Sequence, residues 1–274
     1  MNFTLTILGT ASALPFSDRN PSAQALSVHG RLFLIDCGEG TQQRMRQLHL
    51  SFLKVEAVCI SHIHGDHCFG LFGVLSTMGL YHRTAPLHIF GPGNLGPILK
   101  FFLSYFGEGL DFEIVFHPLG CKGLEEVSTD DMPFARQVKI SAFPLNHKID
   151  CFGYRFDEVV SPRRNPWTPR SYAYCSDTAP FPELAGWVRD VDLLYHEATY
   201  PAELEQKAVQ YFHSTTSQAA RCALAANAKK LIVGHYSSRV KDLAVFREEC
   251  AAIFPESVAA NDGDVFEIEY IRNV

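Results

Sequence analysis

The sequence lacks three features that would narrow its class at once: a long apolar run, an excess of basic residues and closely paired cysteines. No apolar run is long enough to span a membrane, and residues 1–7 alternate like a strand without a positively charged leader. We therefore expect neither a membrane anchor nor a signal peptide. The formal net charge of −6 excludes a general basic footprint for nucleic acid but leaves room for a local basic patch.

The eight cysteines form no Cys-x-x-Cys pair, which argues against a zinc ribbon and a redox dithiol. Most of them lie in apolar runs, where a reduced and buried thiol is expected. Cys68 stands next to a histidine cluster, but we do not expect it to be a metal ligand. Reduced thiols and the missing signal peptide together predict a cytoplasmic protein.

What the chain does contain is enough apolar material for a substantial core, since 47% of its 274 residues are hydrophobic. This length allows one large domain or two small ones. Alternating and helix-periodic segments predict an α/β chain, with Thr215 as a helix N-cap and Gln218 three residues on. Strands are predicted over 3–8, 23–28, 32–35, 55–60, 87–90, 112–116, 138–143, 154–156, 172–174, 191–195, 231–233 and 265–270. Helices are predicted over 41–48, 69–80, 95–106, 201–211, 215–226 and 241–253.

The densest chemistry lies in the stretch Ser61-His62-Ile63-His64-Gly65-Asp66-His67. It follows a mostly apolar predicted strand and precedes a predicted helix, so it forms a tight turn at Gly65. His62 and His64 would face one point, and Asp66 and His67 a neighbouring point. Imidazole nitrogens and a carboxylate oxygen suit zinc or manganese, so this turn is a candidate metal site.

Three more polar residues follow predicted strands: His147, Asp177 and His235. Strand ends on one rim of a sheet converge, which is how scattered ligands meet. Each residue alone is weak evidence, because a single histidine at a strand end is more often a hydrogen-bonded surface residue. Together with the turn they make seven candidate ligands, too many for one tetrahedral zinc but suited to two zinc ions that share a carboxylate.

The His-x-His-x-Asp-His pattern of residues 62–67 resembles the signature of the metallo-β-lactamase superfamily. Other stretches resemble its ribonuclease Z branch, the endonucleases that process the 3′ ends of tRNA. They are Gly9-Thr10, residues 15–20, Phe152-Gly153-Tyr154-Arg155, His196-Glu197-Ala198-Thr199, Phe212-His213-Ser214-Thr215-Thr216 and the run ending at Arg239. The resemblance covers nearly the whole chain in order.

This resemblance implies a single domain over 1–274 with an αββα sandwich of two mixed β-sheets flanked by helices. It implies that one zinc ion is held by His62, His64 and His147, that a second is held by Asp66, His67 and His235, and that Asp177 bridges them. Manganese would also suit these ligands. It assigns His213 as the proton donor, Glu197 as the carboxylate that orients it, and Asp66 as the general base. On the residues alone, Glu197 and His213 would be read as a capping or surface pair.

The implied substrate is precursor tRNA, cut to leave a tRNA 3′-hydroxyl and a 5′-phosphate on the trailer, and the implied assembly is a homodimer. Two departures bear on recognition. Ser17 replaces a family lysine in a loop that senses the tRNA 3′ end. Many bacterial members carry a long arm between the positions that match His147 and Asp177. Here only a short segment over 157–170, which we call the arm remnant, stands in its place. The arm is either shortened in this protein or missing from the printed sequence.

Arginines are the candidate substrate-binding residues. They are Arg163, Arg164 and Arg170 in the arm remnant, with Arg19 and Arg239 nearer the metal ligands. A solvated connector is an equally good interpretation of the arm remnant. The alternative function is a zinc phosphodiesterase for small phosphodiesters. A non-catalytic RNA-binding protein would be expected to have lost metal ligands, and none of the seven is lost here. A di-iron oxidative role fits poorly with the Glu197 and His213 pair, which suits acid–base chemistry.

Overall fold

The computed structural model describes residues 2–14, 18–160, 168–240 and 242–270. The first half of the chain contains β1 (Phe3–Gly9), β2 (Ala23–Val28), β3 (Arg31–Cys37), α1 (Thr41–Gln47), the 3₁₀-helix η1 (Phe52–Lys54), β4 (Val55–Cys59), α2 (Gly65–Cys68), α3 (Leu71–Leu80), β5 (Leu87–Pro92), α4 (Leu95–Phe106), β6 (Ile114–Leu119) and β7 (Glu125–Glu126). The second half contains β8 (Val138–Pro144), β9 (Phe152–Glu158), β10 (Ser171–Cys175), α5 (Leu184–Trp187), β11 (Leu193–Glu197), the 3₁₀-helix η2 (Ala202–Leu204), α6 (Glu205–Tyr211), α7 (Thr216–Ala225), β12 (Leu231–Gly234), α8 (Ala244–Ile253), β13 (Ser257–Ala259) and β14 (Val265–Glu267).

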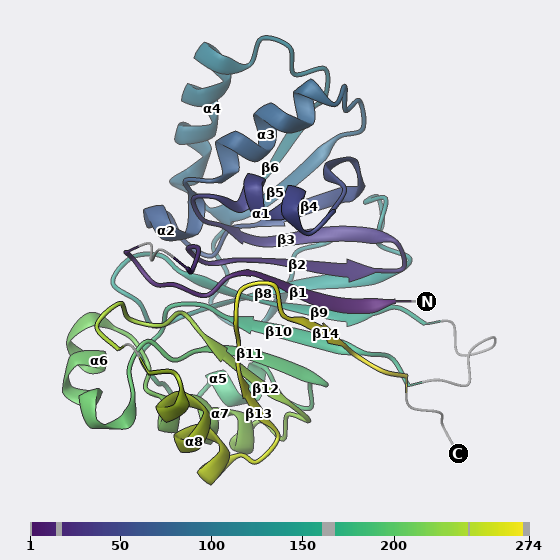
Figure 1. The fold of residues 1–274 in the computed structure, drawn as a ribbon. Helices are drawn as coiled ribbons and strands as arrows, with labels where there is room; N and C mark the ends of the chain where they lie inside the picture. The colour runs from purple at the N-terminus through teal and green to yellow at the C-terminus, as the bar shows by residue number, and fades with distance from the viewer. Residues whose placement is uncertain (1, 15–17, 161–167, 241, 271–274) are drawn as a thin grey trace.

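These strands form two seven-stranded mixed sheets, ordered β14-β1-β2-β3-β4-β5-β6 and β13-β12-β11-β10-β9-β8-β7. The sheets lie face to face, with α1 to α4 outside the first and α5, α7 and α8 outside the second (Figure 1). The predicted αββα sandwich is confirmed. No helix within the described residues is both long enough and apolar enough to cross a membrane.

Alternation along the strands explains why both faces of each sheet are buried. In β3, Phe33 and Ile35 point between the sheets, while Leu32 and Leu34 point to the helices of the first layer. The side chains between the sheets include large aromatic rings such as Tyr154 and Phe156. Burying each such ring stabilises the fold by roughly 1.5–3 kcal/mol.

Several predicted boundaries are confirmed and some are corrected. Helix α4 spans the predicted 95–106, and Thr215 caps α7 through a reciprocal capping box with Gln218. The predicted helix over 69–80 begins two residues later, as α3 at Leu71. Gly70, just before it, lies against the Gly38 carbonyl: an added Cβ on Gly70 would be 2.0 Å from that oxygen. This close approach brings the loop after β3 against the turn that carries the histidine cluster.

Candidate metal centre and active site

The candidate site lies at one rim of the sandwich, where strands from both sheets end. Strands β8, β10, β11 and β12 run in the same direction, as their pairing shows, so their C-terminal ends share one edge. This edge carries His147, Asp177, Glu197 and His235, and β4 of the other sheet delivers the turn with the histidine cluster. In Figure 1 the rim lies on the side of α2 and α6, away from the N-terminus.

The first group of side chains surrounds one point with four donor atoms. His62 Nε2 lies 2.9 Å from His64 Nδ1, which lies 3.3 Å from His147 Nε2. Asp177 Oδ2 lies 3.6 Å from His62 Nε2 and 3.9 Å from His147 Nε2. These four atoms have the mutual spacing needed to hold one metal ion.

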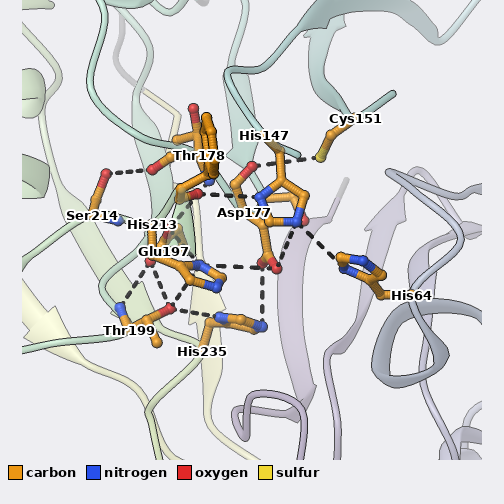
Figure 2. Close-up of polar contacts among 12 residues, drawn as sticks. His64, His147, Cys151, Asp177, Thr178, Glu197, Thr199, His213, Ser214 and His235 are labelled. Atoms are coloured by element: carbon orange, nitrogen blue, oxygen red, sulfur yellow. Dashed lines mark hydrogen bonds and ion pairs between the residues drawn. The ribbon is translucent and has the colours of Figure 1, made fainter. Parts of the chain in front are cut away.

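A second group lies beside the first. His67 Nε2 is 3.2 Å from His235 Nε2, and both are 3.4 Å from Asp66 Oδ2. Asp177 Oδ1 is 3.4 Å from His67 Nε2 and 3.2 Å from His235 Nε2. Asp177 thus turns one carboxylate oxygen to each group, and Figure 2 shows its carboxylate with His64, His147 and His235 around it.

The outer nitrogen of each buried imidazole is already occupied. His67 Nδ1 donates to Asp36 Oδ2 at 2.7 Å, and His147 Nδ1 donates to the Phe212 carbonyl at 3.1 Å. His235 Nδ1 lies 2.8 Å from the Thr199 hydroxyl oxygen, and His62 Nδ1 lies 3.0 Å from that of Ser61. Such outer contacts fix the ring and its tautomer, and they leave the inner nitrogen free to bind a metal.

The electrostatics of the cluster suit a cation. Burial lowers the pKa values of His62, His64 and His147, which favours the neutral form that binds metals. Burial opposes ionisation of Asp177, but the surrounding imidazoles, His235 and His67 first, hold its pKa below the usual range. Its Oδ1 is buried and makes no hydrogen bond within the part of the chain that the structure describes. The residues therefore fit metal ions, and the His/Asp cluster is able to hold them.

His213 and Glu197 form a separate pair at the same site. His213 Nδ1 lies 3.0 Å from Glu197 Oε1 and 3.9 Å from Asp177 Oδ2. Burial alone would lower the pKa of His213, but the Glu197 and Asp177 carboxylates outweigh it and raise the pKa to about 9. The imidazolium form is thus held at neutral pH, which is what a general acid requires.

Glu197 is fully buried and organises three segments through its carboxylate. Oε1 accepts from the backbone N–H groups of Thr178 and Ser214, at 3.1 and 2.8 Å. Oε2 accepts from the backbone N–H and the hydroxyl of Thr199, both at 2.8 Å. With His213 these contacts satisfy both oxygens, so the carboxylate cannot turn away from the imidazole.

The sequence analysis missed Asp36, which supports the turn from beneath. Its carboxylate accepts from the Ser61 backbone N–H, the Ser61 hydroxyl, His67 and the Tyr174 hydroxyl, at 2.6–2.8 Å. Asp36 adopts a left-handed backbone, φ 53°, that aims the side chain inward. The sequence signal that could have identified Asp36 is its place at the end of a buried strand, in Asp36-Cys37-Gly38. Thr199 was also missed as a contact of His235.

The candidate substrate-binding arginines differ in exposure and in position relative to the site. Arg239 is exposed and lines the site cavity, whereas Arg19 donates to Thr10 and Asn261 and stays half-buried. Both stay predictions. Arg163 and Arg164 lie outside the described residues, within the arm remnant that connects the antiparallel neighbours β9 and β10.

The prediction for Arg170 is wrong, because its side chain is buried. The guanidinium pairs with Glu158 through two nitrogens, at 3.0 and 2.8 Å, donates to the Ile268 carbonyl and lies 3.6 Å from the centre of the Tyr270 ring. Only 2% of Arg170 is exposed. It is a structural residue and not a contact for a substrate phosphate.

An open cavity of about 990 Å³ gives access to this centre. Its walls include Asp66, Asp177, His213 and His235, so candidate ligands and the His213–Glu197 pair are reached from the same space. Two cationic side chains, Lys148 and Arg239, also line it. The seven predicted ligands and both members of the predicted acid pair are thus brought together at one accessible site.

Comparison with known proteins agrees with this fold. A family model described as the β-lactamase superfamily domain matches residues 31–236. The fold is that of the metallo-β-lactamase superfamily, and the His/Asp cluster at its rim is able to hold metal ions. Within it, ribonuclease Z of Bacteroides thetaiotaomicron is 36% identical over 95% of this chain and 93% of its own length. Ribonuclease Z of Porphyromonas gingivalis is 36% identical over 95% of this chain and 97% of its own length.

Among solved structures, the short form of human tRNase Z superposes with a TM-score of 0.82 at 28% identity, covering 97% of this chain and 99% of the human one. The chain belongs to the ribonuclease Z family, as the resemblance in the sequence implied. The alignments with the two bacterial relatives extend over 300 residues, more than the 274 of this chain. Those relatives therefore contain stretches with no counterpart here.

Proposed function

We propose that this chain is a zinc-dependent endoribonuclease that removes the 3′ trailer from tRNA precursors. The ribonuclease Z relatives and the human tRNase Z structure support the substrate class. The observation that carries the proposal is the position of Asp177, whose two oxygens face two separate donor groups beside a complete His213–Glu197 pair.

Two zinc ions per chain, or manganese in their place, would be held by the seven predicted ligands. His62, His64 and His147 would hold the first, Asp66, His67 and His235 the second, and Asp177 both. When bound, such a pair of ions stabilises the charge that develops on the phosphodiester and lowers the pKa of a water toward neutrality. The side chains of the protein supply proton transfer and the orientation of the attacking water.

His213 provides the proton for the departing 3′ oxygen. Its Nδ1 is held by Glu197, so Nε2 lies on the opposite edge of the ring, and His213 lines the cavity where the substrate enters. Proton transfer from Nε2 leaves a 3′-hydroxyl on the tRNA and a 5′-phosphate on the trailer. Asp66 also lines the cavity, and its pKa is held low by His67 and His235 although burial opposes this. An ionised Asp66 can orient the attacking water and accept its proton.

Because the chain is acidic overall, a polyanionic substrate must be held by local cations. Lys148 and Arg239 on the cavity wall are suited to phosphates near the cleaved bond. Arg163 and Arg164 in the arm remnant are proposed for other phosphates of the substrate. The homodimer and the cytoplasmic location stay predictions from the sequence.

The alternative is a zinc phosphodiesterase for small phosphodiesters, which is favoured by the short connection between β9 and β10. A cleavage assay on a precursor tRNA, with the cut position and the end groups mapped, separates the two. We expect one cut after the acceptor stem, with a 3′-hydroxyl and a 5′-phosphate. Hydrolysis of a small chromogenic diester without cleavage of any precursor would favour the alternative.

A further inference from the structure

Three exposed aromatic side chains line the cavity next to the proposed chemistry, and Phe69 and Tyr211 are more exposed than the third, Phe212. Phe69 is 65% exposed and Tyr211 is 46% exposed, yet both line the same cavity as Asp66 and His213. Phe69 caps the C-terminus of α2, and Tyr211 is the last residue of α6. Figure 1 shows α2 on the side of the first sheet and α6 on the side of the second, so the two residues belong to elements on opposite sides of the rim.

Both rings are attached to backbone close to the proposed catalytic groups. An added Cβ on Gly65 would lie 2.5 Å from the Phe69 ring, so the ring rests directly on the metal-binding turn. Tyr211 precedes Phe212, whose left-handed backbone (φ 59°) ends α6 and whose carbonyl receives the His147 hydrogen bond. Both rings therefore adjoin segments that carry proposed metal ligands.

Exposed aromatic rings at a site of this kind suit nucleobases better than phosphates or sugars. A single-stranded 3′ trailer has unstacked bases, and proteins commonly hold such bases against aromatic faces. Stacking tolerates any base, so it suits an enzyme that must accept trailers of varied sequence.

We propose that Tyr211 and Phe69 are stacking platforms for the two nucleotides on either side of the cleaved bond. This inference rests on the proposed function. The departing 3′ oxygen belongs to the last retained nucleotide and must lie next to His213, two residues from Tyr211. Tyr211 therefore stacks the last base of the tRNA. Phe69, on the opposite wall and three residues from Asp66, stacks the first base of the trailer.

The test pairs a protein change with removal of one base from the substrate. Precursor RNAs are made with an abasic nucleotide at the first trailer position or at the last tRNA position, and kcat/KM is measured for wild type, Phe69→Ala and Tyr211→Ala, all in the zinc-loaded form. Phe69→Tyr keeps an aromatic face and serves as the rescue variant. Phe101→Ala is the matched control, because Phe101 is 62% exposed on α4 and is not among the cavity-lining residues described.

We expect Phe69→Ala to lower kcat/KM on the intact precursor by roughly 5- to 150-fold, the range for loss of one stacked base. On the substrate that lacks the first trailer base, Phe69→Ala and wild type should differ by less than about twofold. Tyr211→Ala should show the same pattern with the last tRNA base. Phe69→Tyr and Phe101→Ala should behave like wild type.

The inference is overturned if Phe69→Ala and Tyr211→Ala cleave the intact precursor like wild type, or if each loses the same factor on intact and abasic substrates. An exchanged pairing, with Phe69 sensitive to the last tRNA base, would overturn the assigned polarity. Failure of wild type to cleave any precursor would instead contradict the proposed function, so the two failures are distinguishable.

Discussion

The hydroxyl of Thr199 lies 2.8 Å from Glu197 Oε2 and, at the same time, 2.8 Å from His235 Nδ1. Because the hydroxyl proton goes to the carboxylate, the Thr199 oxygen accepts from His235. Glu197 therefore holds the proposed acid His213 directly and a proposed metal ligand through one hydroxyl, as Figure 2 shows. The proton donor and the second metal group are positioned by the same buried carboxylate.

Replacing this carboxylate should shift the pH dependence of cleavage. His213 must be protonated to act, and the carboxylates raise its pKa to about 9. Glu197→Gln removes the larger of those two influences, so the pKa falls and the alkaline limb of kcat moves to lower pH. Profiles of kcat on a precursor tRNA measure this. Glu205→Gln removes an equal charge from the exposed surface of α6 and should leave the limb in place. If the alkaline limb of the kcat profile does not move in Glu197→Gln, that limb does not report the ionisation of His213.

Removing the proposed acid should cost rate and leave the metal in place. We expect His213→Ala to lose ~10²–10⁴-fold in kcat, the usual contribution of general acid catalysis, because water must then protonate the leaving oxygen. Zinc content should match wild type, since each of the two groups keeps its donors. The measurement is single-turnover cleavage together with elemental analysis. A near wild-type rate would rule out His213 as the acid.

Asp36, which the sequence analysis missed, should govern zinc affinity. Asp36→Asn retains the left-handed backbone, which asparagine adopts readily, but it weakens the acceptor that orients His67. Zinc affinity should fall by about 10- to 100-fold, as measured by competition with a chelator. Asp192→Asn is the matched control, because Asp192 accepts from Ser171 at the opposite end of β11. Equal zinc affinity in both variants would show that His67 does not depend on Asp36.

The buried Glu158–Arg170 pair should matter for stability and not for recognition. Glu158→Gln removes the buried carboxylate charge that pairs with the Arg170 guanidinium through two nitrogens, so we expect a loss of about 3–5 kcal/mol in the free energy of unfolding by urea. The control Lys139→Ala breaks an exposed pair with Glu126, which is worth at most about 1 kcal/mol. Binding of precursor tRNA by the folded protein should not change. If Glu158→Gln weakened tRNA binding without a loss of stability, Arg170 would instead be interpreted as a substrate contact.

The same pair gives stability a pH dependence of known sign. Burial opposes ionisation of Glu158, but Arg170 outweighs it and lowers the pKa. This stabilisation is present above the unfolded pKa of a glutamate and is lost as pH falls through the lower, folded pKa. Wild type and Glu158→Gln should therefore converge in stability under acid conditions.

The sequence predicted the parts of this molecule that depend on local pattern. Residues 62–67 stand together in the chain, helix 95–106 has a clear apolar period, and Thr215 carries a capping signal that needs only Gln218. The convergence of His147, Asp177 and His235 was expected from their positions at predicted strand ends, whereas their division between two metal ions came from the family resemblance.

The remaining features depend on contacts between segments distant in sequence. Asp36 supports His67 across 31 positions, and Arg170 is buried by Glu158 and by a carbonyl near the C-terminus. Gly70 likewise approaches the Gly38 carbonyl across 32 positions of the chain. No spacing along the chain marks such contacts, so pattern alone predicted Arg170 as a substrate contact on the surface.

Stepwise zinc addition to chelator-treated protein, followed by cleavage of a precursor tRNA, tests the two-metal site most directly. If Asp177 joins two metal groups into one catalytic centre, the cleavage rate should rise to a plateau at two zinc ions per chain. The products should then carry a tRNA 3′-hydroxyl and a trailer 5′-phosphate. A plateau at one zinc ion per chain, or a precursor that stays uncut at saturating zinc, would contradict the account.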